Sequence, residues 1–126
     1  MSNIKSIIIT QITNFINELN EIYPNNKEIT VFRERFNLLK NVNSQLILDY
    51  FIKYIYTHKE KILNQNETFF LDGGGQEKIH ESNLNMRDNI RILWINNMTE
   101  DNKKIVWKYF KTFILLIDKY LLEKSK

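Results

Sequence analysis

The chain has no cysteine and no alanine, and only one proline and three glycines, among its 126 residues. Without cysteine, disulfides, thiolate zinc sites and cysteine nucleophiles are all excluded. Without alanine, any helix must be stabilised by packing of its side chains rather than by intrinsic helix propensity. The sequence therefore favours a domain that is held together by a hydrophobic core.

Long hydrophobic runs are also missing. The run Ile7-Ile8-Ile9 has polar residues on both sides and is too short for a secretory signal or a membrane span. No other apolar run approaches the roughly 18 residues that a membrane helix needs. We therefore predict a soluble intracellular protein that has no membrane partner.

What is abundant is asparagine, isoleucine and lysine, with 17, 19 and 14 copies. These residues have A/T-rich codons, so their clusters carry less weight as functional signals. The length fits one helical domain over residues 1–126, which can bury roughly two thirds of its unfolded surface. The net charge is only +3, which is small for a protein that follows the phosphates of a duplex.

The first half of the chain predicts three helices. Apolar residues recur at three and four from residue 4 to 23, where Pro24 ends the first helix. Asn26 is expected to cap a second helix whose inward face ends at Val42. Its other inward residues are expected to be Ile29, Phe32, Phe36 and Leu39.

Asn43 or Ser44 is expected to open the third helix. Residues 46–56 are almost wholly apolar, which is typical of a central helix that meets solvent along one narrow strip. The expected polar residues of this strip are Gln45, Asp49, Lys53, Tyr56 and Glu60. The helix is expected to extend or kink into residues 58–64.

A flexible loop is predicted at about residues 64–78, because all three glycines stand together at 73–75. A further helix should begin near Ser82 and end near Asn97. Its inward residues are expected to be Met86, Ile90, Leu93 and Trp94.

The last helix is the most clearly marked. Thr99 is expected to cap it, and Glu100 and Asp101 place negative charge in its positive first turn. At 100° per residue one face is apolar and is predicted to be core. The residues of this face are Val106, Phe110, Phe113, Ile114, Ile117, Tyr120 and Leu121.

The strand pattern of alternating apolar and polar residues is not found along the chain. We therefore predict an all-α fold: a compact bundle of about five helices, with the third helix central and a long amphipathic C-terminal helix.

Several segments together carry a resemblance to a known family. They are 15–19 with 22–26, 38–43, 69–72, 93–94 and 102–110. In these segments the chain resembles small all-helical proteins encoded by giant, nucleocytoplasmic large DNA viruses. The resemblance implies a viral protein of the host cytoplasm or viral factory, which the virion can also carry. It implies no cofactor or active residues, and Gly73-Gly74-Gly75 departs from the charged or aromatic residues usual after Phe-Phe-Leu.

Catalytic and ligand-binding signals are weak. The run from Asp72 to Gly75 follows no strand and matches neither a Walker nor a dinucleotide motif. His80-Glu81 lacks the second histidine of a zinc protease, and His58 is the only other histidine. We therefore expect no enzyme, no cofactor, no metal and no small-molecule substrate.

The outer arc of the last helix supplies the candidate binding residues. Lys104, Lys108, Lys111 and Lys119 form a basic stripe there, which suggests an accessory nucleic-acid-binding protein as one alternative. Leu115 and Leu122 project from the same arc and are hard to explain as solvated residues.

Seven residues separate the two leucines, so both can enter one groove of another helix. We therefore favour a non-enzymatic interaction protein that docks a protein partner, or itself as a weak homodimer. In the homodimer Asp118 is expected to meet lysines of the second copy.

Overall fold

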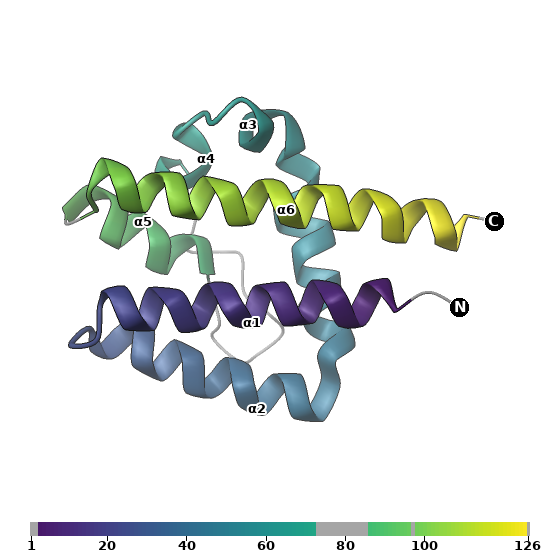
Figure 1. Cartoon of the computed structure of the whole chain (residues 1–126), viewed down its shortest axis with the longest axis horizontal. Helices are drawn as coiled ribbons and strands as arrows, with labels where there is room; N and C mark the ends of the chain where they lie inside the picture. Colours follow the sequence, from purple (N-terminus) through teal and green to yellow (C-terminus); the bar gives the residue numbers. More distant parts are fainter. Residues whose placement is uncertain (1–2, 73–85, 97, 126) are drawn as a thin grey trace.

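The part of the chain that the structure describes, residues 3–72, 86–96 and 98–125, consists of helices joined by short turns and has no strand (Figure 1). This confirms the predicted all-α class. The elements of this computed structural model are α1 (Ile4–Ile22), α2 (Lys27–Tyr50), the π-helical turn η1 (Phe51–Ile55), the 3-10 turn η2 (Tyr56–His58), α3 (Lys59–Leu63), α4 (Thr68–Leu71), α5 (Met86–Asn96) and α6 (Glu100–Lys124).

The first and last helices of the chain, α1 and α6, pack side by side and antiparallel (Figure 1). Helix α2 packs along the other side of α1. Helix α1 therefore has a long helix on each side. Helix α5 follows the short α4 and packs against it.

The chain turns sharply at Asn43, whose backbone is extended (φ −158°, ψ 84°) inside an otherwise helical stretch. The predicted start of a third helix at this point is therefore confirmed. Val42, in contrast, was expected to face the core but is 83% exposed, because it precedes the turn at which the chain leaves α1. Leu39 is only partly buried.

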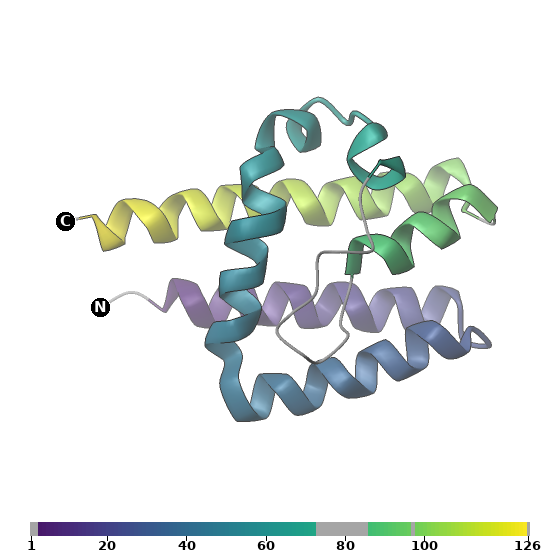
Figure 2. The same ribbon diagram turned by 180° about the vertical axis from the view of Figure 1, so that it is seen from behind.

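Beyond the turn, residues 44–58 form what we call the transverse segment. It crosses one side of both α1 and α6 (Figure 2), so the helix that we expected at the centre covers the α1–α6 pair. Its buried residues are Ile47, Leu48, Tyr50, Phe51 and Ile55. The expected polar strip is largely confirmed, since Asp49, Lys53 and Glu60 are exposed. The expected kink is present as η1 and η2.

The predicted loop at 64–78 is wrong in its first half. Residues 68–71 form α4, and Phe69 and Phe70 are fully buried. The side-chain oxygen of Asn66 accepts hydrogen bonds from the backbone N and the hydroxyl of Thr68, at 3.0 and 2.7 Å. Two buried aromatic rings outweigh the loop tendency of the polar residues before them. Residues 73–78, and the predicted helix start near Ser82, lie outside the described residues.

Two predicted helix caps are confirmed. The side chain of Asn26 accepts a hydrogen bond from Ile29 N at 3.1 Å, and that of Thr99 accepts one from Asn102 N at 3.2 Å. The predicted inward residues of α5 are also confirmed, since Met86, Ile90, Leu93 and Trp94 are at most 5% exposed.

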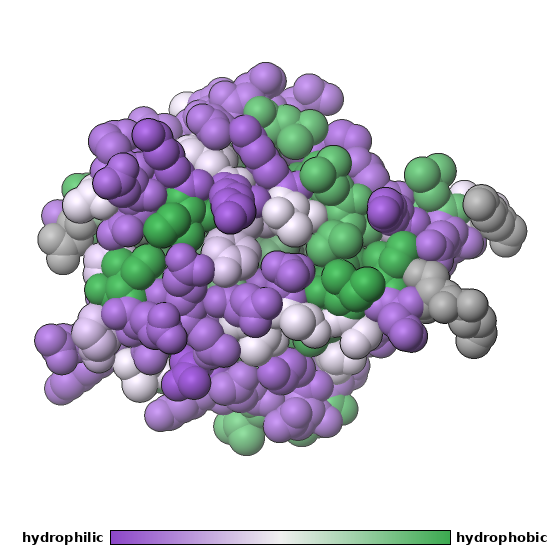
Figure 3. Space-filling model, in the orientation of Figure 1, coloured by the Kyte–Doolittle hydropathy of each residue, from purple (hydrophilic) through white to green (hydrophobic). Residues whose placement is uncertain are grey.

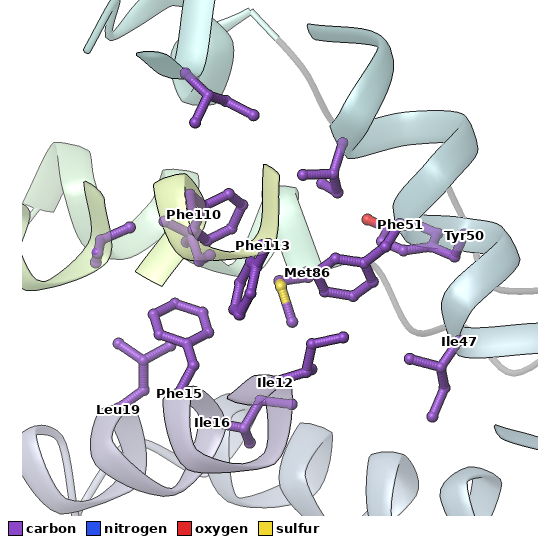
Figure 4. Close-up of a cluster of buried hydrophobic side chains, with 14 of the residues drawn as sticks. Ile12, Phe15, Ile16, Leu19, Ile47, Tyr50, Phe51, Met86, Phe110 and Phe113 are labelled. Atoms are coloured by element: carbon purple, nitrogen blue, oxygen red, sulfur yellow. The ribbon is translucent and has the colours of Figure 1, made fainter. Parts of the chain in front are cut away.

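The core is rich in aromatic rings that come from elements far apart in the chain (Figure 4). The Phe113 ring of α6 lies 5.4 Å from that of Phe51, 5.2 Å from Phe110 and 6.0 Å from Phe15, between ring centroids. Met86 points into the space between these rings and α1. The predicted core face of α6 is confirmed, with Tyr120 and Leu121 partly buried at its end.

Candidate docking face on the last helix

The outer arc of α6 is exposed, as the sequence predicts. Leu115 and Leu122 are 61% and 63% exposed and lie on the side of α6 that faces away from the core. Lys104, Lys108 and Lys119 are exposed and Lys111 is partly buried. We call these six residues the docking stripe.

The stripe is continuous along the helix. Its members follow one another at intervals of three and four residues, so they form one line along roughly 27 Å of α6. The lysines dominate its first half, and the two leucines stand in its second half. The stripe is therefore basic along its first half, and its second half holds the two leucines with Lys119 between them.

The four lysines of the stripe carry unneutralised charge. Within the described residues, none of them lies within 4.0 Å of a carboxylate oxygen. Lys103, one residue before the stripe, differs because its Nζ lies 3.5 Å from Glu67 Oε1 and 3.6 Å from Glu100 Oε1. The stripe lysines thus differ from Lys103, whose ion pairs lie within the chain.

Asp118 has partners inside the chain. Its Oδ1 accepts hydrogen bonds from the hydroxyl of Tyr56 and, at 3.2 Å, from Nζ of Lys59. The hydrogen bond to Asp118, with burial, raises the pKa of Tyr56, and the same carboxylate raises the pKa of Lys59. This cluster fastens the η2 region to α6. The expected pairing of Asp118 with a second copy would have to compete with it.

A hollow of about 440 Å³ lies beside the second half of the stripe. It is lined by Tyr56, Asp118, Leu121, Leu122 and Ser125. Leu122 therefore stands at the rim of a depression, and a side chain of a partner could enter next to it.

More apolar surface flanks this end of α6. Ile7 is 46% exposed and belongs to the end of α1 that lies beside the C-terminal half of α6 (Figure 1). Figure 3 shows hydrophobic side chains gathered over these two helix ends, with hydrophilic residues around them. An apolar area with a polar rim is typical of a protein contact surface.

Arg87 is a residue that sequence analysis did not single out. It is 3% exposed, its Nε donates to Phe69 O at 3.1 Å, and its guanidinium carbon lies 4.3 Å from the centroid of the Phe69 ring. No local pattern signals it, because Phe69 is 18 residues away in sequence. This arginine joins α5 to α4 and is buried, so it belongs to the packing of the fold.

Glu67, Trp94 and Lys103 form a second polar cluster that sequence analysis missed. The Glu67 carboxylate accepts a hydrogen bond from Trp94 Nε1 at 2.8 Å, and Lys103 Nζ lies 5.1 Å from the Trp94 ring centroid. These contacts connect Glu67, the residue before α4, to both α5 and α6.

The next question is whether the described residues could form a metal site or a membrane span. These contain no group of three or more histidines and carboxylates placed to hold a metal ion. The ring of His58 is tilted against that of Phe69, with 5.6 Å between their centroids. His80 and the glycine run lie outside the described residues. No described helix is both long and apolar enough to cross a membrane.

Comparison with known proteins finds no matching family model, no matching curated protein and no matching solved structure. The case for a docking site therefore comes from the residues of this chain alone.

Proposed function

We propose that the chain is a non-enzymatic interaction protein that docks another helix on the stripe of α6. One observation carries this proposal: the exposed Leu115 and Leu122 lie on one line with four lysines that have no ion pair in the described residues, and Leu122 borders a hollow of about 440 Å³. Burial of the part of each leucine that is still exposed would be favourable by about 1–2 kcal/mol.

The resemblance to helical proteins of large DNA viruses suggests where such a protein acts. We propose the host cytoplasm or viral factory, with the virion as a further site. This part of the proposal rests only on the sequence segments that carry the resemblance.

The proposal is tested with matched pairs of lysine substitutions. Leu115→Lys with Leu122→Lys changes the stripe, while Leu38→Lys with Val42→Lys adds the same charge at α2 positions that are 68% and 83% exposed. Circular dichroism should show both variants folded, because none of the four side chains is in the core. Proteins captured from cells that express the chain are then compared, and self-association is measured by sedimentation velocity.

We expect the stripe variant to lose a captured partner or its self-association, and the α2 variant to keep them. If the wild type and both variants are monomeric and capture the same proteins, the docking proposal is wrong.

An accessory role in nucleic-acid binding is the second candidate, because the four stripe lysines have no ion-pair partner in the described chain. Four phosphate contacts predict that the logarithm of duplex affinity falls with the logarithm of salt with a slope of roughly −3.6. Lys108→Ala should reduce this slope by about 1. A labelled duplex that fails to shift at low salt would exclude this candidate.

A further inference from the structure

The stripe also indicates what kind of helix it binds. This inference rests on the proposed function and concerns the chemistry of the occupant. Three of the four lysines stand in the first half of the stripe, and the second half holds both leucines with Lys119. A partner must therefore offer negative charge opposite the lysines of the first half and apolar side chains opposite the leucines of the second half.

The charge of the stripe is what disfavours a second copy of the chain. Between Asp101 in the first turn and Glu123 near the end, Asp118 is the only carboxylate of α6, and it already contacts Lys59. A second stripe would bring four more lysines into the contact, against Glu123 as the one carboxylate of α6 beside the stripe without an ion pair in the described residues. Like charges held opposite one another oppose association.

Duplex nucleic acid is complementary to the lysines but not to the leucines. Protein surfaces that follow a duplex commonly make about six to ten phosphate contacts, more than the four lysines provide. Phosphates would also leave Leu115, Leu122 and the hollow beside Leu122 unused. An acidic helix with apolar residues uses both halves of the stripe.

We propose that the occupant is an acidic amphipathic helix of another protein. Its carboxylates lie against Lys104, Lys108 and Lys111, and its apolar side chains pack on Leu115 and Leu122, one of them entering the hollow lined by Tyr56 and Leu121. The charges speed encounter and fix the register, and the two leucines supply most of the affinity.

The test uses designed peptides as probes. The acidic probe is an alanine-based helix of about 20 residues, with glutamates spaced to face Lys104, Lys108 and Lys111 and leucines spaced to face Leu115 and Leu122. It is made in both chain directions, because the partner can run parallel or antiparallel to α6. One control peptide has lysine for glutamate, and another has alanine for leucine. Binding to the full chain is measured by fluorescence anisotropy.

We expect one direction of the acidic probe to bind, and both control peptides to bind at least about tenfold more weakly. The triple variant Lys104→Glu, Lys108→Glu, Lys111→Glu should reverse the preference and bind the lysine peptide. Lys27→Glu, Lys53→Glu, Lys61→Glu makes the same change in net charge away from the stripe and should bind like the wild type.

The inference is overturned if neither direction of the acidic probe binds, or if the lysine peptide binds equally well. It is also overturned if the off-stripe triple variant loses the acidic probe as fully as the stripe variant. In these cases the proposed function is judged separately by whether Leu115→Lys with Leu122→Lys removes a captured partner. Loss of that partner without probe binding would leave docking in place and exclude only the acidic helix.

Discussion

The hydroxyl of Tyr109 donates a hydrogen bond of 2.7 Å to Oε1 of Glu18 and so links α6 to α1, 91 residues apart in the chain. Burial, followed by the bond to the carboxylate, raises the pKa of Tyr109 to about 12. The two helices that open and close the chain are thus joined at their edge by a bond that requires a protonated phenol.

This bond predicts a loss of stability in alkali. The unfolded tyrosine ionises near pH 10, whereas folded Tyr109 keeps its proton until about pH 12. Its contribution is therefore complete below pH 10 and is lost as the pH rises from about 10 to 12. Urea unfolding should show the difference in stability between the wild type and Tyr109→Phe shrinking over this range. A difference that is constant with pH would contradict the assignment.

The core of α6 predicts a large cost for Phe113→Ala. This ring is fully buried and meets Phe15, Phe51 and Phe110, so its loss should cost about 3–5 kcal/mol. Leu115→Ala on the same helix should change stability by less than about 0.5 kcal/mol, because Leu115 is exposed. Equal melting temperatures for the two variants would mean that α6 docks by another face.

The helix caps allow a matched comparison of one residue type. Asn26→Ala removes the bond to Ile29 N and should cost about 1 kcal/mol. Asn3→Ala at the start of α1 should cost only a few tenths, because the Asn3 side chain makes no capping hydrogen bond. Chemical denaturation of both variants measures the difference, and equal costs would contradict the cap at Asn26.

Because Arg87 is buried against Phe69, we expect that a lysine at this position cannot restore the full stability of the fold. Arg87→Met removes the bonds to Phe69 O and the contact with the ring, and should cost about 1.5–3 kcal/mol. Arg91→Met, on the same helix, breaks a 2.8 Å pair with Asp88 that is about one third exposed, so its cost should be about 1 kcal/mol or less. Arg87→Lys should recover only part of the loss, since a lysine lacks the planar fork. Thermal unfolding of the three variants distinguishes these outcomes.

Local features of the fold were predictable from the sequence. The cap at Thr99 and the core face of α6 depend on residues within a few turns, and both are present. The break at Asn43 was also predicted, but the direction that the chain takes there was not. That direction depends on packing against α1 and α6, and it is the reason that Val42 is exposed.

The candidate site was predictable to a similar degree. The exposure of Leu115 and Leu122 follows from their angle on the helix, whereas the partners of Asp118 do not. Lys59 lies 59 residues from Asp118 in sequence, and only the folded chain brings them together. Arg87 was missed for the same reason, because its partner Phe69 lies 18 residues away in sequence.

The positions of the tryptophans determine what a fluorescence experiment can report. Trp94 stacks on Phe70 at 4.6 Å and meets Trp107 at 5.4 Å, between ring centroids, so both indoles of the chain occupy the corner where α4, α5 and α6 join. The pair formed by α1 and α2 has no indole. Emission spectra therefore record the melting of that corner, while far-ultraviolet dichroism records all helices. Coincident transitions by the two signals would show that the hairpin of the first two helices unfolds together with the rest of the domain.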